Sequence, residues 1–341
     1  MPNPSQSDLH INVPLTNVSI AYIQNSDVFI ADKVFPKVPV EKQSDAYYKY
    51  SKSAWRRTNA QRRAPGTETV GVGWDVTMDS YFAHVYGVHK DIDDQTRANA
   101  DSVFALDKDA TAFVTNQLLL KRDLDWAGTY FRAGVWGEDI ALSSSASTAD
   151  MKPWDLSTSD PIMFMANQQI AFHQETGFKA NTMVMGANVK KALKNHPAII
   201  DRIKYTQKGI VSDDLIATLF EVDKIFTSMA TYSTGPDIPD AKAQDAAATN
   251  SFIANPDSVL LCHTASAPSL MTPTAGYTFT WKGYLGGNSQ GIRMFRFRMD
   301  HIRSDRIEGE MTYDMKVVAP DMGKFITGVV GTTEEEEPTV P

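Results

Sequence analysis

The longest uninterrupted pattern in the sequence covers residues 96–131 and predicts one long helix. Its apolar residues recur at gaps of three and four, which is the spacing of a single apolar face on an α-helix. The spacing fails only at Gln117, and no Pro or Gly occurs before Gly128. At 1.5 Å per residue the helix would be roughly 50 Å long, so we expect a spine. The apolar positions are Val103, Leu106, Ala110, Phe113, Leu120, Leu124, Ala127 and Phe131.

Signals for a helix start and stop flank this stretch. Asp91, Asp93 and Asp94 precede it, where carboxylates favour the positive end of a helix dipole, and Gly134 and Gly137 follow it. A coiled-coil rod is the alternative interpretation, but heptads do not continue beyond the helix and strand-rich segments lie on both sides. We therefore expect a sheet to pack across the apolar face.

Composition indicates an ordinary folded protein with a sizeable core, divided into two or three domains, because 42% of the 341 residues are apolar and 22% are charged. The N-terminus MPNPSQSDLH resembles no secretory signal, and no run of about 18 apolar residues exists, so we expect a cytoplasmic protein without a membrane span. The net charge of -8 argues against a dedicated nucleic-acid binder. The one cysteine, Cys262, ends an apolar run and is expected to be a buried strand thiol.

The beginning of the chain predicts extended structure. Residues 1–25 are polar and contain three prolines, so we expect an arm that folds only against another surface. Across residues 27–40, Pro36 and Pro39 permit an edge strand, exclude a central strand, and lead us to expect no helix.

A basic and aromatic segment lies between Asp45 and Glu68, with no acidic residue inside it. The chain turns at Pro65-Gly66, and the alternation of apolar residues from Val70 to Met78 then predicts a returning strand, giving a long hairpin. An isolated hairpin is marginal in water, so we expect this one to lie on an acidic surface of a neighbouring copy. The alternative is a solvated basic loop. The residues assigned to contacts between subunits are Lys49, Lys52, Arg56, Arg57, Arg62 and Arg63.

The second half of the chain alternates helices and strands. We expect a helix from Pro161 to near Gly177, a buried strand over 182–186, and helical pieces over 188–204. Strands over 219–232 and 258–263 enclose an exposed loop over 235–250. Near the end, Phe295, Phe297 and Met299 are expected to form a buried strand face, with Arg296 and Arg298 on a charged face.

A search for catalytic and metal-binding patterns gives weak candidates. Ser289 lies in a Gly-x-Ser-x-Gly pattern, but a strand follows it where a hydrolase needs a helix, so a glycine-rich hairpin turn is the better interpretation. The seven histidines never pair at helical metal-ligand spacing, although His84 and His89 come near each other on a strand. The aspartates before the spine lack a calcium-loop pattern, and Gly71-Val72-Gly73 lacks a dinucleotide-site pattern and is expected to be strand packing or a bulge.

The order of these parts resembles a tailed-bacteriophage major capsid protein of the Hong Kong 97-type capsid fold, an α+β fold. Three phrases carry the resemblance, at residues 30–36, 183–193 and 313–320. It implies an N-terminal arm over 1–44, an E-loop hairpin over 45–80, a P-domain over 81–177 that holds the spine helix, an A-domain over 178–290, return strands of the P-domain over 291–330, and an acidic flexible tail over 331–341.

The resemblance also implies a function without an active site or cofactor. Such proteins self-assemble through hexamers and pentamers into an icosahedral head around double-stranded DNA, in the cytoplasm of the host bacterium. It implies a separate scaffolding protein, a portal and decoration proteins as partners, and no membrane. We assume no covalent cross-link. The alternatives are an encapsulin-like shell of the same fold, a hydrolase that uses Ser289, and a single-strand nucleic-acid binder that uses the basic hairpin.

Overall fold

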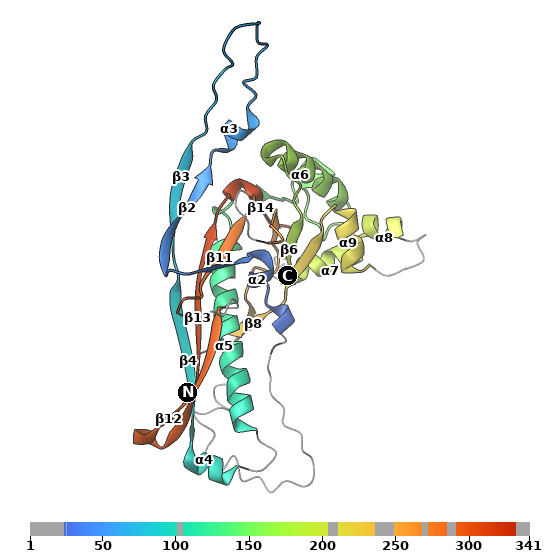
Figure 1. Ribbon diagram of the computed structural model, residues 1–341. Coiled ribbons are helices and arrows are strands. Elements are labelled where there is room, and N and C mark those ends of the chain that lie inside the picture. Colours follow the sequence, from blue (N-terminus) through green and yellow to red (C-terminus); the bar gives the residue numbers. More distant parts are fainter. Residues whose placement is uncertain are drawn as a thin grey trace, which may run out of the picture.

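The computed structural model describes residues 24, 26–100, 105–203, 211–235, 249–267, 272–284 and 291–331. The described chain forms an elongated α+β molecule in which long strands and a spine helix make the body (Figure 1). A hairpin extends from one end, and a group of shorter helices lies to one side. Most of the arm predicted over 1–25, of the loop predicted over 235–250 and of the acidic tail predicted over 331–341 lies outside the described residues.

The spine is helix α5 (Leu106–Tyr130), which is shorter than the single helix predicted over 96–131. The prediction is wrong at its start, because Ala100 has an extended backbone and ends a separate helix, α4 (Asp94–Asn99). Asp93 caps α4 by accepting a hydrogen bond from the Thr96 N–H at 2.7 Å. The carboxylates expected at the start of the spine therefore lie at the start of α4.

The buried face of α5 also differs from the predicted apolar face. Val114, Leu118 and Trp126 are buried, four or eight residues apart, whereas the predicted Phe113 and Leu120 are only half-buried. The two buried charged residues Arg122 and Asp123 lie between Leu118 and Trp126. An apolar pattern alone misses this face because part of it is polar and paired with another segment.

The first sheet has the order β1-β11-β13-β12, with β4 paired to the other side of β13. The helix α5 packs on β13 and β4, as the sequence predicts for a sheet across the spine. Val114 and Leu118 approach β13 at Gly309, where a Cβ would lie 2.5 Å from Val114 Cγ1. The strands are β1 (Lys37–Val40), β4 (His84–Asp93), β11 (Gly276–Trp281), β12 (Ile292–Met299) and β13 (Ser304–Val317).

The second sheet has the order β5-β14-β10-β6-β7 and carries most of the remaining core. Cys262 on β10 is fully buried, and this burial raises the pKa of its thiol to about 12, which confirms the predicted buried strand thiol. The strands are β5 (Glu138–Ala141), β6 (Thr182–Gly186), β7 (Lys224–Ser228), β10 (Val259–Cys262) and β14 (Gly323–Thr327), while β8 (Thr231–Ser233) and β9 (Asn250–Phe252) form a separate pair.

The helices beside this sheet confirm the local signals in the sequence. Asp160 caps the first of them by accepting a hydrogen bond from the Met163 N–H at 3.0 Å, and Gly177 ends it with a φ of 81°. The strand predicted over 182–186 is buried along its length. The helices are α6 (Pro161–Thr176), α7 (Ala187–Asn195), α8 (Pro197–Ile203) and α9 (Asp213–Leu219), with the 3-10 turns η2 (Ala149–Met151) and η4 (Pro320–Met322).

A helical turn occurs in the segment where none was predicted. Helix α2 (Ala31–Val34) follows the 3-10 turn η1 (Ser26–Val28) and comes before the edge strand β1, where Pro39 lies as expected. The Asp123 carboxylate on α5 accepts the N–H groups of Ile30 and Ala31 at 2.9 and 2.8 Å, so a distant residue stabilises this turn. Proline patterns do not reveal such a tertiary cap.

One prediction about the end of the chain is wrong. On β12 the side with Arg296 and Arg298 faces α4 and α5, where both are ion-paired, while Phe297 on the other side stays exposed. The glycine-rich turn predicted around Ser289 lies outside the described residues, apart from Gly291; the strands on either side of it, β11 and β12, both pair with β13.

Candidate assembly surfaces

The hairpin consists of β2 (Ser44–Tyr50) and β3 (Val76–Phe82), paired antiparallel (Figure 1). Its inner face rests on the first sheet, where the ring of Tyr81 stacks on Phe279 at 4.5 Å between centroids and Tyr47 lies 5.3 Å from the same ring. The strand predicted from Val70 begins only at Val76. The paired part of the hairpin is therefore shorter than predicted.

The outer face of the hairpin is apolar and open to solvent. The cross-strand pairs Tyr48–Met78 and Tyr50–Val76 lie on it, since successive side chains on a strand alternate between faces. Met78 and Tyr48 are 68% and 64% exposed. Contiguous exposed apolar surface of this kind marks interaction sites. The alternation is visible in the sequence, but the residues predicted to make the contact were the basic ones of the hairpin.

Beyond the strands, residues 57–75 form a loop with a second exposed apolar set. Val70, Val72 and Trp74 alternate with glycines, and all three are exposed. Trp74 contacts Trp55 of the short helix α3 (Lys52–Arg56), with 5.8 Å between ring centroids. The expectation that residues 71–73 form strand packing or a bulge is wrong, because they are solvent-exposed loop.

The six predicted contact residues differ in their surroundings. Lys49 forms an ion pair with Asp79 across the hairpin at 2.8 Å, and Arg63 donates to a nearby backbone carbonyl. Arg57 and Arg62 are exposed and have no hydrogen bond or ion pair within the described part of the chain. These two guanidinium groups remain available to another molecule.

Lys52 and Arg56 bind their own subunit. The Arg56 guanidinium donates to the backbone carbonyl of Gln174 at 2.8 Å and to that of Glu175, in the last turn of α6. Lys52 Nζ lies 2.7 Å from the Asp321 carboxylate and 3.8 Å from Glu175. Cations are favourable at the carbonyl end of a helix, so this pair anchors the base of the hairpin on α6.

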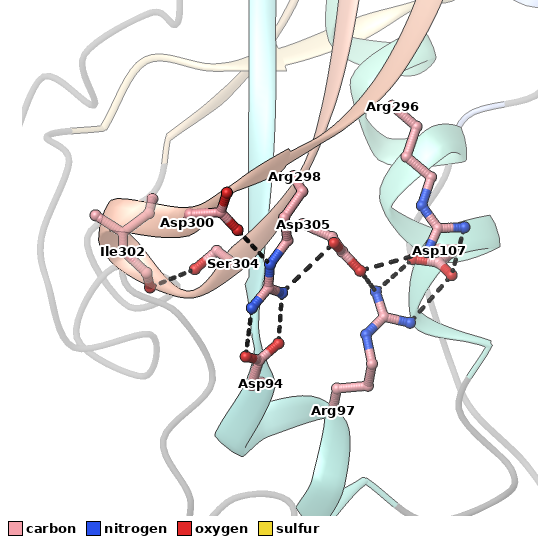
Figure 2. Close-up of polar contacts among 9 residues, drawn as sticks. All are labelled: Asp94, Arg97, Asp107, Arg296, Arg298, Asp300, Ile302, Ser304 and Asp305. Atoms are coloured by element: carbon pink, nitrogen blue, oxygen red, sulfur yellow. Dashed lines mark hydrogen bonds and ion pairs between the residues drawn. The ribbon is translucent and has the colours of Figure 1, made fainter.

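Figure 2 shows an ion network at the opposite end of the molecule, where α4, the start of α5 and the tip of β12 and β13 meet. Arg298 binds both carboxylate oxygens of Asp94 at 2.6 Å. The Arg97 guanidinium lies 2.8 Å from the Asp107 carboxylate and 3.1 Å from the Asp305 carboxylate, so it links the two. Hydrogen bonding to these arginines lowers the pKa of Asp94 and Asp107. The remaining members are Arg296 and Asp300.

A buried Ser–His pair has the geometry of a structural contact. Ser159 Oγ lies 3.0 Å from His196 Nε2, and Ser159 donates to the Leu156 carbonyl at 2.8 Å. His196 Nδ1 accepts the Ala198 N–H at 3.2 Å, which places the ring proton on Nε2. That nitrogen then donates to Ser159 and does not act as its base. Both side chains are buried away from solvent.

The described residues were also compared with the requirements of a membrane-spanning helix and of a metal site. Among these residues no helix combines the length and apolar character that crossing a bilayer requires. No three His, Cys, Asp or Glu side chains in the same ranges converge as metal ligands. Asp91, considered as a metal ligand, instead forms a two-point ion pair with Arg306 at 2.7 and 2.8 Å.

Comparison with solved structures identifies the fold. A phage-related protein of Bordetella bronchiseptica RB50 superposes with a TM-score of 0.65 at 20% identity, covering 90% of this chain and 93% of the other. The capsid of cyanophage P-SCSP1u superposes with a TM-score of 0.56 at 13% identity, covering 94% and 93%. The chain therefore has the Hong Kong 97-type capsid fold, as the resemblance in its sequence implied.

Sequence comparison then gives the family, although no family model matches the chain. The major capsid protein of Burkholderia phage BcepMu is 30% identical over 231 residues, which are 65% of this chain and 70% of the relative. The chain belongs to the phage major capsid proteins. Its role is structural and its place is the virion.

Proposed function

We propose that many copies of this chain assemble, through hexamers and pentamers, into the closed icosahedral head of a tailed phage that encloses double-stranded DNA. The observation that carries this proposal is the exposed apolar outer face of the hairpin around Tyr48 and Met78. Within the described chain this face stays open to solvent, and burying it against a neighbour would remove apolar surface from water at about 25 cal/mol per Å². Repetition over a closed shell multiplies this gain.

The proposed division keeps the bounds that the resemblance implies. The hairpin over 45–80 is the E-loop, residues 81–177 with α5 and α6 and the return strands over 291–330 form the P-domain, and residues 178–290 with α7 to α9 form the A-domain. The proposed partners are other copies of the chain, a separate scaffolding protein, a portal, decoration proteins and packaged DNA held without sequence specificity. Assembly takes place in the cytoplasm of the host bacterium. The described surfaces serve contact and not catalysis. His196 carries its ring proton on Nε2, toward Ser159, and in this state it does not accept the serine proton.

The alternatives from sequence analysis have less support. An encapsulin-like shell is not favoured, because the matched relatives are phage major capsid proteins. A single-strand binder would stack bases on free aromatic rings. Trp55 instead contacts the rings of Tyr50 and Trp74, and Arg56 is engaged by α6.

The test is assembly of the purified chain, alone and with a co-expressed scaffolding protein, followed by sedimentation and electron microscopy. We expect closed shells or related tubes and sheets. Tyr48→Glu with Met78→Glu should reduce the sedimenting fraction at least tenfold with unchanged circular dichroism. The control is Met229→Glu, which alters a methionine that is 51% exposed on another surface. Wild-type chains that remain monomeric under both conditions would refute the proposal.

A further inference from the structure

Helix α7 has a basic exposed side and contains no Asp or Glu. The carboxylate of Asp213 on α9 lies 2.6 Å from Lys190 Nζ and 3.8 Å from Lys194 Nζ, so one negative charge is shared between two lysines. Lys191 forms no ion pair within the described part of the chain. The lysines of α7 therefore outnumber the carboxylates that contact them. The exposed residues of the helix are Asn188, Lys191, Lys194 and Asn195.

The last described residues of the chain lie beside the start of this helix. The Val329 N–H donates to the Asp257 carbonyl at 3.2 Å, and the Asp257 carboxylate accepts the side-chain N–H of Asn188 at 2.8 Å. Asn188 is the second residue of α7, and Lys191 follows it by three positions on the same side of the helix. The chain therefore leaves the described structure close to the exposed lysines of α7.

We propose that Glu334–Glu337 of the same subunit dock on Lys191 and Lys194 of α7. These four consecutive glutamates follow Gly331, the last described residue, by three to six positions. An extended segment of that length spans about 10–20 Å. Lys191 and Lys194 lie about 4.5 and 9 Å beyond Asn188 along the helix axis. The glutamates therefore reach both lysines without any change in the described structure.

The charges where the chain leaves the described structure direct the glutamates toward α7. The Gly331 N–H donates to the Asp155 carboxylate at 3.3 Å, and the Asp257 carboxylate lies near the same point, so further carboxylates are repelled from it. A single exposed ion pair with a lysine is weak. The tether offsets this weakness, because a site joined to its ligand by a short linker sees an effective concentration on the order of millimolar.

Docking closes the basic side of α7 to other polyanions. Nucleic acid binds lysines through its phosphates, and four adjacent carboxylates present the same sign of charge to the same side chains. The glutamates then act as an intramolecular competitor that limits nucleic-acid binding by the free subunit. This contact lies within one subunit, so it does not depend on the proposed shell.

The first test is cross-linking of the full-length, unassembled chain with a carbodiimide, which joins a carboxylate to an amine where the two are in contact. Peptide mass spectrometry of the monomer should find Lys191 or Lys194 joined to Glu334–Glu337. These links should fall at least tenfold in about 0.5 M NaCl, because salt screens exposed charges. The control lysines are Lys42 and Lys108, which are exposed on other surfaces. Links that join the glutamates only to other lysines, or only to a second subunit, would overturn the proposal.

The second test measures binding of a short DNA duplex to the unassembled chain by fluorescence anisotropy. Removal of residues 332–341 should tighten binding about fivefold at low salt, because the lysines lose their competitor. The same truncation should give no gain when Lys191→Gln and Lys194→Gln are present.

The matched control is Lys42→Gln with Lys108→Gln, which changes the net charge equally and should keep the full gain. Equal gains in the two lysine backgrounds would assign the effect to net charge and overturn the docking on α7. Absence of any gain on truncation of the wild-type chain would overturn the competing role of the glutamates. Neither result bears on the proposed function, since both tests use the free subunit.

Discussion

The carboxylate of Asp123 in the spine helix accepts a hydrogen bond from the backbone N–H of Ala31 at 2.8 Å and so attaches helix α2 to α5. The same oxygen accepts the N–H of Ile30, while the other oxygen is buried without a partner in the described chain. Burial raises the pKa of Asp123 to about 6, although the two N–H groups oppose the shift. The connection between the start of the chain and the spine is therefore sensitive to pH.

The sign of this sensitivity follows from proton binding. The ordinary pKa of the group is 3.8, so between about pH 4 and 6 the folded subunit retains a proton that the unfolded chain releases. The contribution of Asp123 to stability is full below pH 3.8 and is lost as the pH rises through 6. We expect the free energy of unfolding of Asp123→Asn relative to wild type to rise by about 2 kcal/mol from pH 4 to pH 7, which is most of the full effect at 1.36 kcal/mol per pKa unit.

The measurement is urea unfolding of unassembled wild-type and Asp123→Asn subunits at both pH values. The asparagine keeps an oxygen that accepts the two N–H groups but does not titrate. All other titrating groups occur in both proteins and cancel in the difference. An unchanged difference between the two pH values would contradict the assignment.

The contact between the spine and β13 depends on Gly309. A Cβ at this position would lie 2.5 Å from Val114 Cγ1 and 2.9 Å from Leu118 Cδ1, both on the buried face of α5. We expect Gly309→Ala to lower the free energy of unfolding by about 1–3 kcal/mol, because overpacking displaces the helix. The matched control is Gly128→Ala on α5, where the added Cβ meets no described atom within 4 Å.

In that control, alanine should raise the free energy of unfolding by about 0.5–1 kcal/mol, because glycine is a poor helix former. Thermal unfolding followed by circular dichroism gives both values. If the two substitutions shift the midpoint in the same direction, the close approach at Gly309 does not limit packing.

Local signals explain which parts of the fold were predictable. The bounds of α6 follow from the cap at Asp160 and the positive φ at Gly177, which act within a few residues. The burial of Arg122 and Asp123 in the spine was not predictable, because it depends on Asp32 and on the N–H groups of α2 far away in the sequence. Hydropathy assigns such residues to the surface.

The same limit applies to the assembly surfaces. The position of the hairpin was visible in the sequence, but the apolar alternation that includes Met78 does not say whether its apolar side faces its own core or a neighbour. The structure places Tyr81 on the core and leaves Met78 exposed. The charge of the basic residues likewise does not say whether they bind their own subunit or a neighbour. In the structure Arg56 binds α6 of its own subunit.

The ion network in Figure 2 should hold the tip of β12 and β13 against α4. Replacing Arg298→Ala removes the two-point contact with Asp94 and the contact with Asp305. These groups are exposed to solvent, so we expect only a small loss in the free energy of unfolding. Amide hydrogen exchange should increase locally in residues 94–99 and 300–304.

The control for this prediction is Arg293→Ala on the same strand, whose guanidinium lies over the Phe295 ring at 4.3 Å. It should leave exchange at the tip unchanged. If amide hydrogen exchange at the tip of β12 and β13 is the same in both variants, strand pairing and not the ion pairs holds the tip in place.

The last prediction concerns Arg57 and Arg62, which have no partner within the described subunit. Replacing both with glutamate should leave the fold intact, because exposed substitutions without contacts usually change stability by less than about 0.5 kcal/mol. Assembly should fall at least tenfold, since each reversed charge would meet a carboxylate of the neighbour and the repulsion repeats at every interface. Lys52 and Arg56 are left unchanged so that the hairpin keeps its anchor on α6.

The matched control is Arg132→Glu with Arg202→Glu, two exposed arginines outside the hairpin that give the same change in net charge. Circular dichroism and light scattering on both double variants separate the outcomes. A normal helical signal with lost high-mass scattering in the hairpin variant alone supports the contact. Equal loss in both variants would mean that net charge is responsible, and normal assembly of the hairpin variant would make this loop a solvated surface.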